Sequence, residues 1–266
     1  MVSKSAVSSF VLVAAIVCQG CAQQQGNKPP NGFVALLNGK DLSGWKGLVA
    51  DPNKRAQMSA EEMLTAQTRA DELMRWNWKV VDGVLIYDGN GFDNICTARD
   101  YNDFELLVDW KIESSSDSGI YLRGSPQVQI WDGLKNGVGS GGLFNNKKGA
   151  SKPLKAADRP AGEWNTFRII MTGKWVIVYL NGELVVDTVT MENYWQPERP
   201  IYPSGPIELQ AHRTRVYFRN IFLRELQLGT RLGKGVNEAT RPGEAPGRSR
   251  AEATETPSRS RIGKNR

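Results

Sequence analysis

The sequence predicts an all-β protein, folded as a two-sheet antiparallel jelly-roll sandwich with one inserted helix. Many short segments rich in β-branched and aromatic residues are separated by turn signals such as Asp82-Gly83 and Asn181-Gly182. Only one stretch has apolar residues at helical spacing, and helices do not alternate regularly with strands. The pattern therefore argues against a doubly wound parallel sheet.

The amino-terminal segment is predicted to be a signal rather than part of the fold. Lys4 precedes an apolar run over residues 10–17, which is shorter than the roughly 20 residues of a membrane-spanning helix and typical of a secretory signal. Gly20 before Cys21 indicates a bacterial lipoprotein site. We expect a signal peptide over residues 1–21, a lipid anchor at Cys21, a linker over 22–31, and a periplasmic or outer-membrane location; plain secretion is the alternative.

The carboxy-terminal segment, residues 229–266, is expected to be a disordered basic tail. It consists mainly of Gly, Pro, Ser, Thr, Glu and Arg, with few residues able to fill a core. Nine basic and four acidic residues lie there, so five of the six net positive charges of the chain belong to it. The domain itself, residues 32–228, is close to neutral, and the basic composition does not predict nucleic-acid binding.

The elements of the domain follow in order. Residues 32–45 read as a strand, an Asn38-Gly39 turn and an anchoring Trp45. Ser59 and Glu62 form a capping box that predicts one helix over about 60–75, covering a sheet edge. Further strands are predicted at 78–81, 84–87, 95–97, 104–112, 164–171, 175–180, 183–187, 207–212 and 216–226, with a Gly-rich loop at 133–149.

The stretch Asp117 to Asp132 is predicted to form two strands joined at residues 124–126, and its alternation defines two faces. Ile120, Leu122, Val128 and Ile130 would enter the core. The opposite face is polar and is repeated in the strand 207–212; its members are Tyr121, Arg123, Gln127, Gln129, Trp131, Glu208, Gln210 and His212. Because such a face is costly to bury dry, it predicts a wet, concave binding surface.

Cysteine usage adds no chemistry to this surface. If Cys21 is acylated, Cys96 is the one thiol of the mature chain, and it is expected to be a small buried hydrophobe on a strand. The spacing predicts neither a zinc site nor a thiol nucleophile.

Eight short motifs, in order over residues 32–228, resemble the 3-keto-disaccharide hydrolase domain family. They are LNGKDLSGW (37–45), DFE (103–105), DSGIYLR (117–123), QVQIWD (127–132), GEWN (162–165), LNG (180–182), GPIELQAH (205–212) and FRNI (218–221). The resemblance implies a concanavalin A-like or laminin G-like jelly roll. Two positions depart from the family pattern: Gln127, which cannot act as a base, stands where many relatives have Glu, and Arg213 follows His212 where Gly is common.

The resemblance also implies an activity, the cleavage of glycosides already oxidised at C3. The C3 carbonyl acidifies the C2 proton, so the reaction needs a base, a donor for the enolate oxygen, and an acid for the leaving oxygen. The catalytic candidates are His212, with Asp132 and Glu208 as alternative base or acid. The substrate-binding candidates are Arg123 and Gln129 as oxyanion donors, Tyr121 and Trp131 as stacking residues, and Gln127 and Gln210.

Structural roles stand beside the catalytic ones. His212 can be a hydrogen-bonded strand residue, Asp132 a turn residue, and Glu208 the ion-pair partner of Arg123. Asp109, Asp132 and Glu208 could together hold a divalent cation, although no loop has calcium-ligand spacing, so no cofactor is predicted.

Three function classes follow from these observations. The first is an envelope-anchored enzyme acting on 3-keto-glycosides, and the second is a non-catalytic carbohydrate-binding module, which Gln127 favours. The third is a structural surface lipoprotein that binds other envelope proteins. The expected partners are a carbohydrate and, through Cys21, a membrane.

Overall fold

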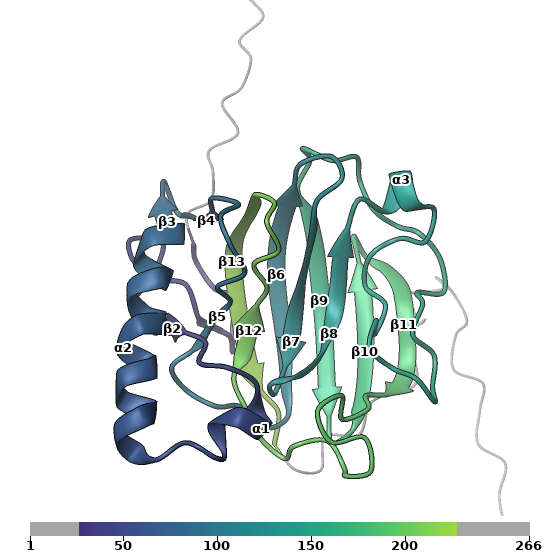
Figure 1. The fold of residues 1–266 in the computed structure, drawn as a ribbon. Helices are drawn as coiled ribbons and strands as arrows, with labels where there is room; N and C mark the ends of the chain where they lie inside the picture. Colours follow the sequence, from purple (N-terminus) through teal and green to yellow (C-terminus); the bar gives the residue numbers. More distant parts are fainter. Residues whose placement is uncertain (1–26, 228–266) are drawn as a thin grey trace, which may run out of the picture. The chain divides into compact units, whose positions relative to one another are not determined.

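The computed structural model describes residues 27–227. The predicted signal peptide, the lipidation site at Cys21 and the predicted tail lie outside the described residues. Within them, two antiparallel β-sheets pack face to face (Figure 1), which confirms the predicted sandwich.

The larger sheet has eight strands. They are β1 (Val34–Ala35), β3 (Trp78–Val81), β4 (Val84–Tyr87), β6 (Phe104–Ile112), β9 (Asn165–Thr172), β10 (Trp175–Leu180), β11 (Glu183–Thr190) and β13 (Val216–Glu225). Their order is β11-β10-β9-β6-β13-β4-β3, and β1 pairs with β13.

The smaller sheet has five strands in the order β2-β5-β12-β7-β8. They are β2 (Trp45–Gly47), β5 (Ile95–Thr97), β7 (Asp117–Leu122), β8 (Ser125–Trp131) and β12 (Ile207–Leu209). The chain crosses repeatedly between the sheets, from β4 to β5 to β6 to β7 and later from β11 to β12 to β13, as jelly-roll sandwiches do.

The core lies between the two sheets and forms one hydrophobic cluster. Its largest fully buried side chains include Trp78, Trp110, Phe104 and Phe167 from the larger sheet, and Ile120 from the smaller one. Burial of these aromatic and aliphatic side chains removes a large apolar area from water. This layer therefore contributes most of the free energy that stabilises the alternating strands. The outward-facing residues are left free to carry function.

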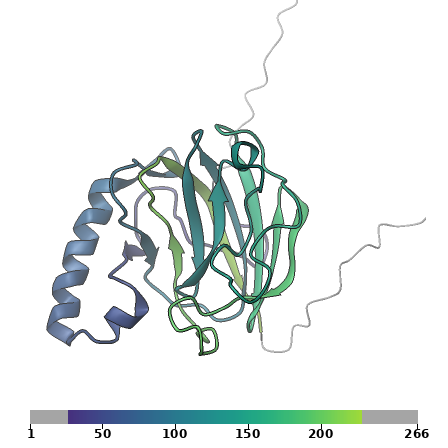
Figure 2. The same ribbon diagram turned by 45° about the vertical axis from the view of Figure 1, so that its right-hand side comes forward.

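Three helices accompany the sheets: α1 (Pro52–Arg55), α2 (Ala60–Asn77) and α3 (Gly133–Asn136). The predicted helix is α2, and its Ser59–Glu62 capping box is present. Figures 1 and 2 show α2 along one side of the sandwich, next to the edge strand β2. The contact requires glycine at Gly47, because an added Cβ would lie 2.1 Å from the Ala70 carbonyl oxygen.

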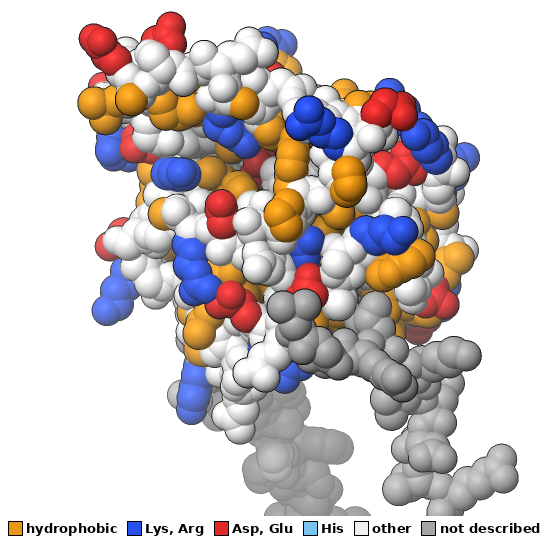
Figure 3. Space-filling model, turned by 90° about the horizontal axis from the view of Figure 1, so that it is seen from below, with side chains coloured by type: hydrophobic (Ala, Val, Ile, Leu, Met, Phe, Trp, Pro, Cys, Tyr) orange, Lys and Arg blue, Asp and Glu red, His pale blue; other side chains and the backbone are white. Residues whose placement is uncertain are grey.

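Two further properties describe the surface of residues 27–227. None of their helices combines the length and the apolar character needed to cross a membrane. On the described surface visible in Figure 3, positive and negative side chains are interspersed with apolar ones rather than gathered by sign.

Candidate functional site

The outer face of the five-stranded sheet carries the polar residues that the alternation predicted. Tyr121 of β7 lies opposite Gln127 of β8 and opposite Glu208 of β12, and Gly119 lies opposite Gln129. Ile120 and Ile207 point into the core instead. The two-residue period of the strands therefore brings Tyr121, Gln127, Gln129 and Glu208 onto one face.

A line of hydrogen bonds crosses this face from β8 to the end of β12. Gln127 Nε2 donates to Gln129 Oε1 at 2.6 Å, and Gln129 Nε2 donates to Asp117 Oδ1 at 2.8 Å. The other Asp117 oxygen lies 3.8 Å from His212 Nδ1. Gly119 makes room for this line, because a Cβ there would lie 2.8 Å from Gln127 Cδ. The carboxylate next to His212 is therefore Asp117, a residue that was not among the predicted site residues.

His212 lies at the exposed rim of the face. Its imidazole is 45% exposed, and its ring meets Phe92 edge to face at 5.4 Å between centroids. The guanidinium of Arg213 lies 4.7 Å from the same Phe92 ring. Together these side chains form a partly aromatic rim at which a ring-shaped ligand can stack.

Two amide oxygens in the middle of the face lack partners. Gln127 Oε1 and Gln210 Oε1 are buried and accept no hydrogen bond from residues 27–227. Gln210 Nε2 donates to the Tyr121 hydroxyl at 3.5 Å. Because a buried acceptor without a donor costs free energy, such atoms commonly mark a place for water or a ligand donor. Sugar hydroxyls are donors of this kind.

Glu208 is the electrostatically most perturbed carboxyl of the face. Its side chain is almost fully buried, and no residue between 27 and 227 forms a hydrogen bond or ion pair with it. Burial raises the pKa of Glu208 to about 7, and the charge of Arg55 partly offsets this rise. A carboxyl group with a pKa near 7 is about half ionised at neutral pH, so it is suited to accept a proton from a ligand.

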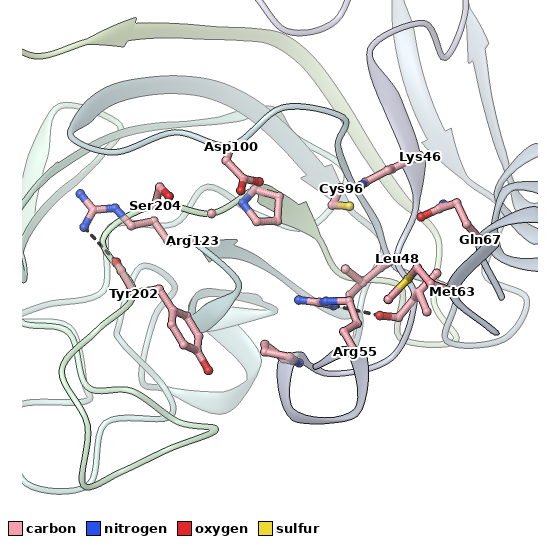
Figure 4. Close-up of a pocket in the computed structure, with 14 residues that line it drawn as sticks. Lys46, Leu48, Arg55, Met63, Gln67, Cys96, Asp100, Arg123, Tyr202 and Ser204 are labelled. Carbon is pink, nitrogen blue, oxygen red and sulfur yellow. Dashed lines mark hydrogen bonds between the residues drawn. The ribbon is translucent and has the colours of Figure 1, made fainter. Parts of the chain in front are cut away.

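A cavity of about 340 Å³ lies between helices α1 and α2 and the smaller sheet; Glu208 is not among the residues that line it, although its strand partner Cys96 is. Its walls include Lys46, Arg55, Met63, Cys96 and Pro206 (Figure 4). Cys96 is directly opposite Glu208 in the strand pairing, which places the cavity at the Glu208 end of the polar face. The volume is within the range of small-molecule sites.

The chemistry of the cavity excludes one of its wall residues as a nucleophile. Burial raises the pKa of the Cys96 thiol to about 12, so the reactive thiolate is not populated at neutral pH. The prediction of a buried, free Cys96 is confirmed. Burial and the neighbouring Glu208 also raise the pKa of Tyr121, so its hydroxyl stays protonated and can donate.

Arg123 does not offer its guanidinium to the face. Nε donates to the Asn102 carbonyl, Nη1 to the carbonyls of Gly173 and Tyr202, and Nη2 to Asp103 at 2.6 Å. Arg123 has a left-handed backbone with φ 57°, so the alternation of β7 ends before it. The predicted oxyanion donor is therefore an internal tie between loops, and its ion-pair partner is Asp103 rather than Glu208.

Asp132 and Trp131 lie at the β8 end of the face, away from Glu208. Asp132 caps α3, accepts from the Ser115 amide at 2.9 Å, and these bonds hold its pKa below the usual range. It therefore has the turn role that was the alternative to catalysis. Trp131 donates to the Gly139 carbonyl and meets Phe144 edge to face, which leaves a partly exposed ring at the rim.

The structure separates the three carboxylates considered for a cation. Asp109 is on the larger sheet, where it accepts from Thr166 and Asn220, whereas Asp132 caps α3 and Glu208 is in the smaller sheet. Within residues 27–227, no group of three or more His, Cys, Asp or Glu side chains is arranged to hold a metal ion.

Sequence reasoning missed two residues of the site. Asp117 begins the motif DSGIYLR and has the outward parity of Tyr121, so alternation alone was enough to place it on the face. Arg55 belongs to a four-residue helix, which is too short for a periodic signal, and its proximity to Glu208 is non-local.

The fold defines a two-sheet β-sandwich protein, and the polar, partly buried face of its smaller sheet is a candidate ligand site. Residues 32–224 match the 3-keto-alpha-glucoside-1,2-lyase-like domain family, and the chain belongs to this family. The family resemblance noted in the sequence motifs is thereby confirmed.

Individual relatives are distant. The chain is 21% identical over 252 residues to a 3-keto-disaccharide hydrolase of Bacteroides thetaiotaomicron, covering 74% of this chain and 79% of that protein. A solved structure of a candidate glycosyl hydrolase of Parabacteroides distasonis is 29% identical, with a TM-score of 0.55 over 74% of this chain and 85% of that one. A second structure from the same organism is 22% identical, with a TM-score of 0.53, covering 74% and 94%, and it supports the fold alone.

Proposed function

We propose that this protein cleaves 3-keto-glycosides by elimination followed by hydration, with Glu208 as the base. Membership of the family supports the substrate class. One observation carries the assignment: Glu208 has an almost fully buried, unpaired carboxyl with a pKa of about 7, and its strand partner Cys96 and the nearby Arg55 line a cavity of suitable size. General bases work best when their pKa lies near the operating pH.

The chemistry proceeds in two stages. The Glu208 carboxylate removes the C2 proton, and the electrons of the C2–H bond form an enolate with the C3 carbonyl. The enolate then collapses, the C1–oxygen bond breaks, and the departing oxygen takes up a proton. Water adds across the resulting C1=C2 bond, so that the net reaction is hydrolysis. The protonated Tyr121 hydroxyl, opposite Glu208 on the neighbouring strand, is placed to donate to the departing oxygen.

The remaining polar residues serve to hold the sugar. Gln127 Oε1 and Gln210 Oε1 lack donors from residues 27–227, so they are available to accept from sugar hydroxyls. Such hydrogen bonds reject ligands that lack the matching hydroxyl, because the buried acceptors are then left unpaired.

His212 and Glu208 differ in their surroundings: His212 lies beyond the end of β12 at the exposed rim, whereas Glu208 is buried within the strand. We therefore assign His212 and its partner Asp117 to binding at the rim. The role of His212 as the base stays a prediction that competes with this assignment.

The test of the function uses the purified protein with 3-keto-trehalose, 3-keto-sucrose and the matching unoxidised sugars, followed by NMR. We expect release of 3-keto-glucose, or its 1,2-unsaturated form, only from the oxidised substrates. Chemical shift changes on binding, without turnover of any sugar, would instead establish the non-catalytic carbohydrate-binding module.

The proposed location is the bacterial envelope, through a lipid on Cys21, and it rests on the sequence around Gly20-Cys21. Expression in a bacterial host with labelled palmitate should label the full-length chain and leave Cys21→Ala unlabelled. Equal labelling of both proteins, or of neither, would refute the anchor.

A further inference from the structure

Arg55 has a fixed position with part of its guanidinium uncommitted. Nη1 donates to the carbonyl oxygens of Val49 at 2.9 Å and Ala50 at 2.6 Å. Neither Nε nor Nη2 forms a hydrogen bond to any residue between 27 and 227. Because the backbone holds one nitrogen, the remaining donors are pre-oriented without a carboxylate partner.

The helix that carries Arg55 is tied to a distant loop. Asn53 Nδ2 donates to the Trp195 carbonyl, and Gln196 Nε2 donates to Asn53 Oδ1, each at 2.9 Å. Trp195 Nε1 in turn donates to the Gly124 carbonyl at 3.0 Å. These bonds tie helix α1 to the loop at 195–196, and that loop to the β7–β8 turn, so the helix that carries Arg55 has a defined position.

Gly124 relates Arg55 to Glu208. A Cβ built on Gly124 would lie 3.3 Å from Glu208 Oε1 and 3.7 Å from Arg55 Nη2. Both groups thus approach one point, yet within the described chain no ion pair of 4.0 Å or less joins them. Arg55 also lines the cavity, and in Figure 4 its guanidinium extends from the α1 side toward the open centre.

The other candidate donors are engaged or remote. The Arg123 guanidinium already donates hydrogen bonds to the Asp103 carboxylate and to three backbone carbonyls. Gln129 Nε2 donates to Asp117 and to two backbone carbonyls. Lys46 is separated from Glu208 by strand β5, and Arg55 is the cation whose charge acts on Glu208.

We infer that Arg55 stabilises the enolate oxygen that develops when Glu208 removes the C2 proton, which makes it a catalytic residue of the reaction proposed above. The inference rests on that proposed function. As the C2–H electrons move into the new C2=C3 bond, the carbonyl pair moves onto the C3 oxygen, which carries the negative charge. A fixed guanidinium with free donors meets this charge at the moment it forms, without needing to reorganise.

The experiment isolates proton abstraction from bond cleavage. A 3-keto-1,5-anhydro sugar has no glycosidic oxygen on C1, so no aglycone can be released; in D2O, exchange of its C2 proton for deuterium reports proton abstraction, and NMR follows this exchange together with the intact C1–O5 bond of the ring. For Arg55→Ala we expect exchange to fall about 100- to 1000-fold, and free guanidinium to restore part of it. The pH profile of the residual exchange should move to higher pH, because Arg55 lowers the Glu208 pKa.

The matched control is Lys54→Ala, which removes the neighbouring exposed cation of the same helix and should leave exchange unchanged. Arg55→Lys keeps the positive charge but lacks the planar set of donors, so it should exchange at an intermediate rate. This variant replaces Arg55→Ala in the test if Arg55→Ala does not fold. Undiminished exchange in a folded Arg55→Ala protein would overturn the inference. So would a loss that guanidinium does not restore and that leaves the pH profile unmoved, because that pattern indicates a purely structural residue. Absence of both exchange and cleavage in the wild-type protein would refute the proposed function itself.

Discussion

The outer faces of the two sheets carry similar residue types, but the carboxylates of the two faces differ in whether they have bonding partners. On the larger sheet, Glu105 accepts from Arg168 and Arg224, and Asp109 accepts from Arg219. On the smaller sheet, the Glu208 carboxyl has neither a hydrogen bond nor an ion pair from residues 27–227, and burial raises its pKa.

Cation–ring contacts occur on both faces, whereas the buried amide groups are left unpaired on the smaller sheet. On the larger sheet, the Lys111 ammonium lies over the rings of Trp164 and Tyr217, so these rings already have a cationic partner within the protein. On the larger sheet, the Thr172 hydroxyl of β9 is a buried polar group without a partner; on the smaller sheet, two amide oxygens of the polar face, Gln127 Oε1 and Gln210 Oε1, have no donor from residues 27–227. A polar face whose groups bond one another contributes to stability, whereas a face with open bonding capacity is available to a ligand.

The largest expected difference between the two faces is the effect of removing one carboxylate from each. Glu208→Gln keeps the shape of the side chain and removes the base, so turnover of a 3-keto-glycoside should fall about 100- to 10,000-fold. Glu105→Gln is the matched control: turnover per folded molecule should persist, while the unfolding free energy falls by about 1–3 kcal/mol because two arginines lose their acceptor. Steady-state kinetics and urea unfolding measure the two effects. Equal activity losses would show that both faces serve the reaction.

The pH dependence of stability is the second difference. The pKa of Glu208 is raised from 4.5 in the unfolded chain to about 7 in the folded one. The folded state therefore binds this proton more tightly, and its contribution is fully present below pH 4.5 and lost as pH rises to 7. At about 1.4 kcal/mol per pKa unit, the loss is about 3 kcal/mol. The unfolding free energy of Glu208→Gln relative to wild type should rise by that amount between pH 4.5 and 8; a constant difference would contradict the perturbed pKa.

The unpartnered amide oxygens predict a smaller trade between stability and binding. Gln210→Met keeps an unbranched side chain and removes the buried Oε1, so the protein should become more stable by up to about 1 kcal/mol. The same change should raise KM, because a sugar hydroxyl loses its acceptor. Thermal unfolding and kinetics with one 3-keto substrate provide both values, and a destabilised variant with unchanged KM would indicate an internal partner for Gln210.

His212→Ala is expected to have the smallest effect on folding and a limited one on catalysis. The imidazole is exposed and lies at the rim, so the unfolding free energy should stay within about 0.5 kcal/mol of wild type. KM should rise while kcat remains well above that of Glu208→Gln. A kcat as low as that of Glu208→Gln would transfer the role of base to His212.

Most of the fold was predictable because strand alternation and turn residues are local signals. The bounds of β3, β4, β5, β6 and β10 agree with the prediction, and α2 begins after the predicted capping box. The strand at 207–212 is shorter as a ladder, with β12 ending at Leu209, and the helices α1 and α3 are too short to have a detectable period.

The site was predictable only where it follows the same alternation. Gln127, Gln129 and Glu208 share a face because their strands pair in register. The two-residue period fails at Arg123, which has a positive φ, and at Asp132, which leaves the strand to cap α3. Arg55 reaches Glu208 through tertiary packing across much of the sequence, for which a single sequence carries no signal.

The rate of chemical modification of Cys96 can report access to this site. It is the one cysteine in residues 27–227, its thiol is buried on the cavity wall, and it lies opposite Glu208. Because the thiol is buried and its pKa is raised, a thiol reagent should modify it slowly, and the modification rate reports access to the cavity wall. Slower modification with a bound sugar, compared with the empty protein, would measure occupancy of the cavity without any turnover.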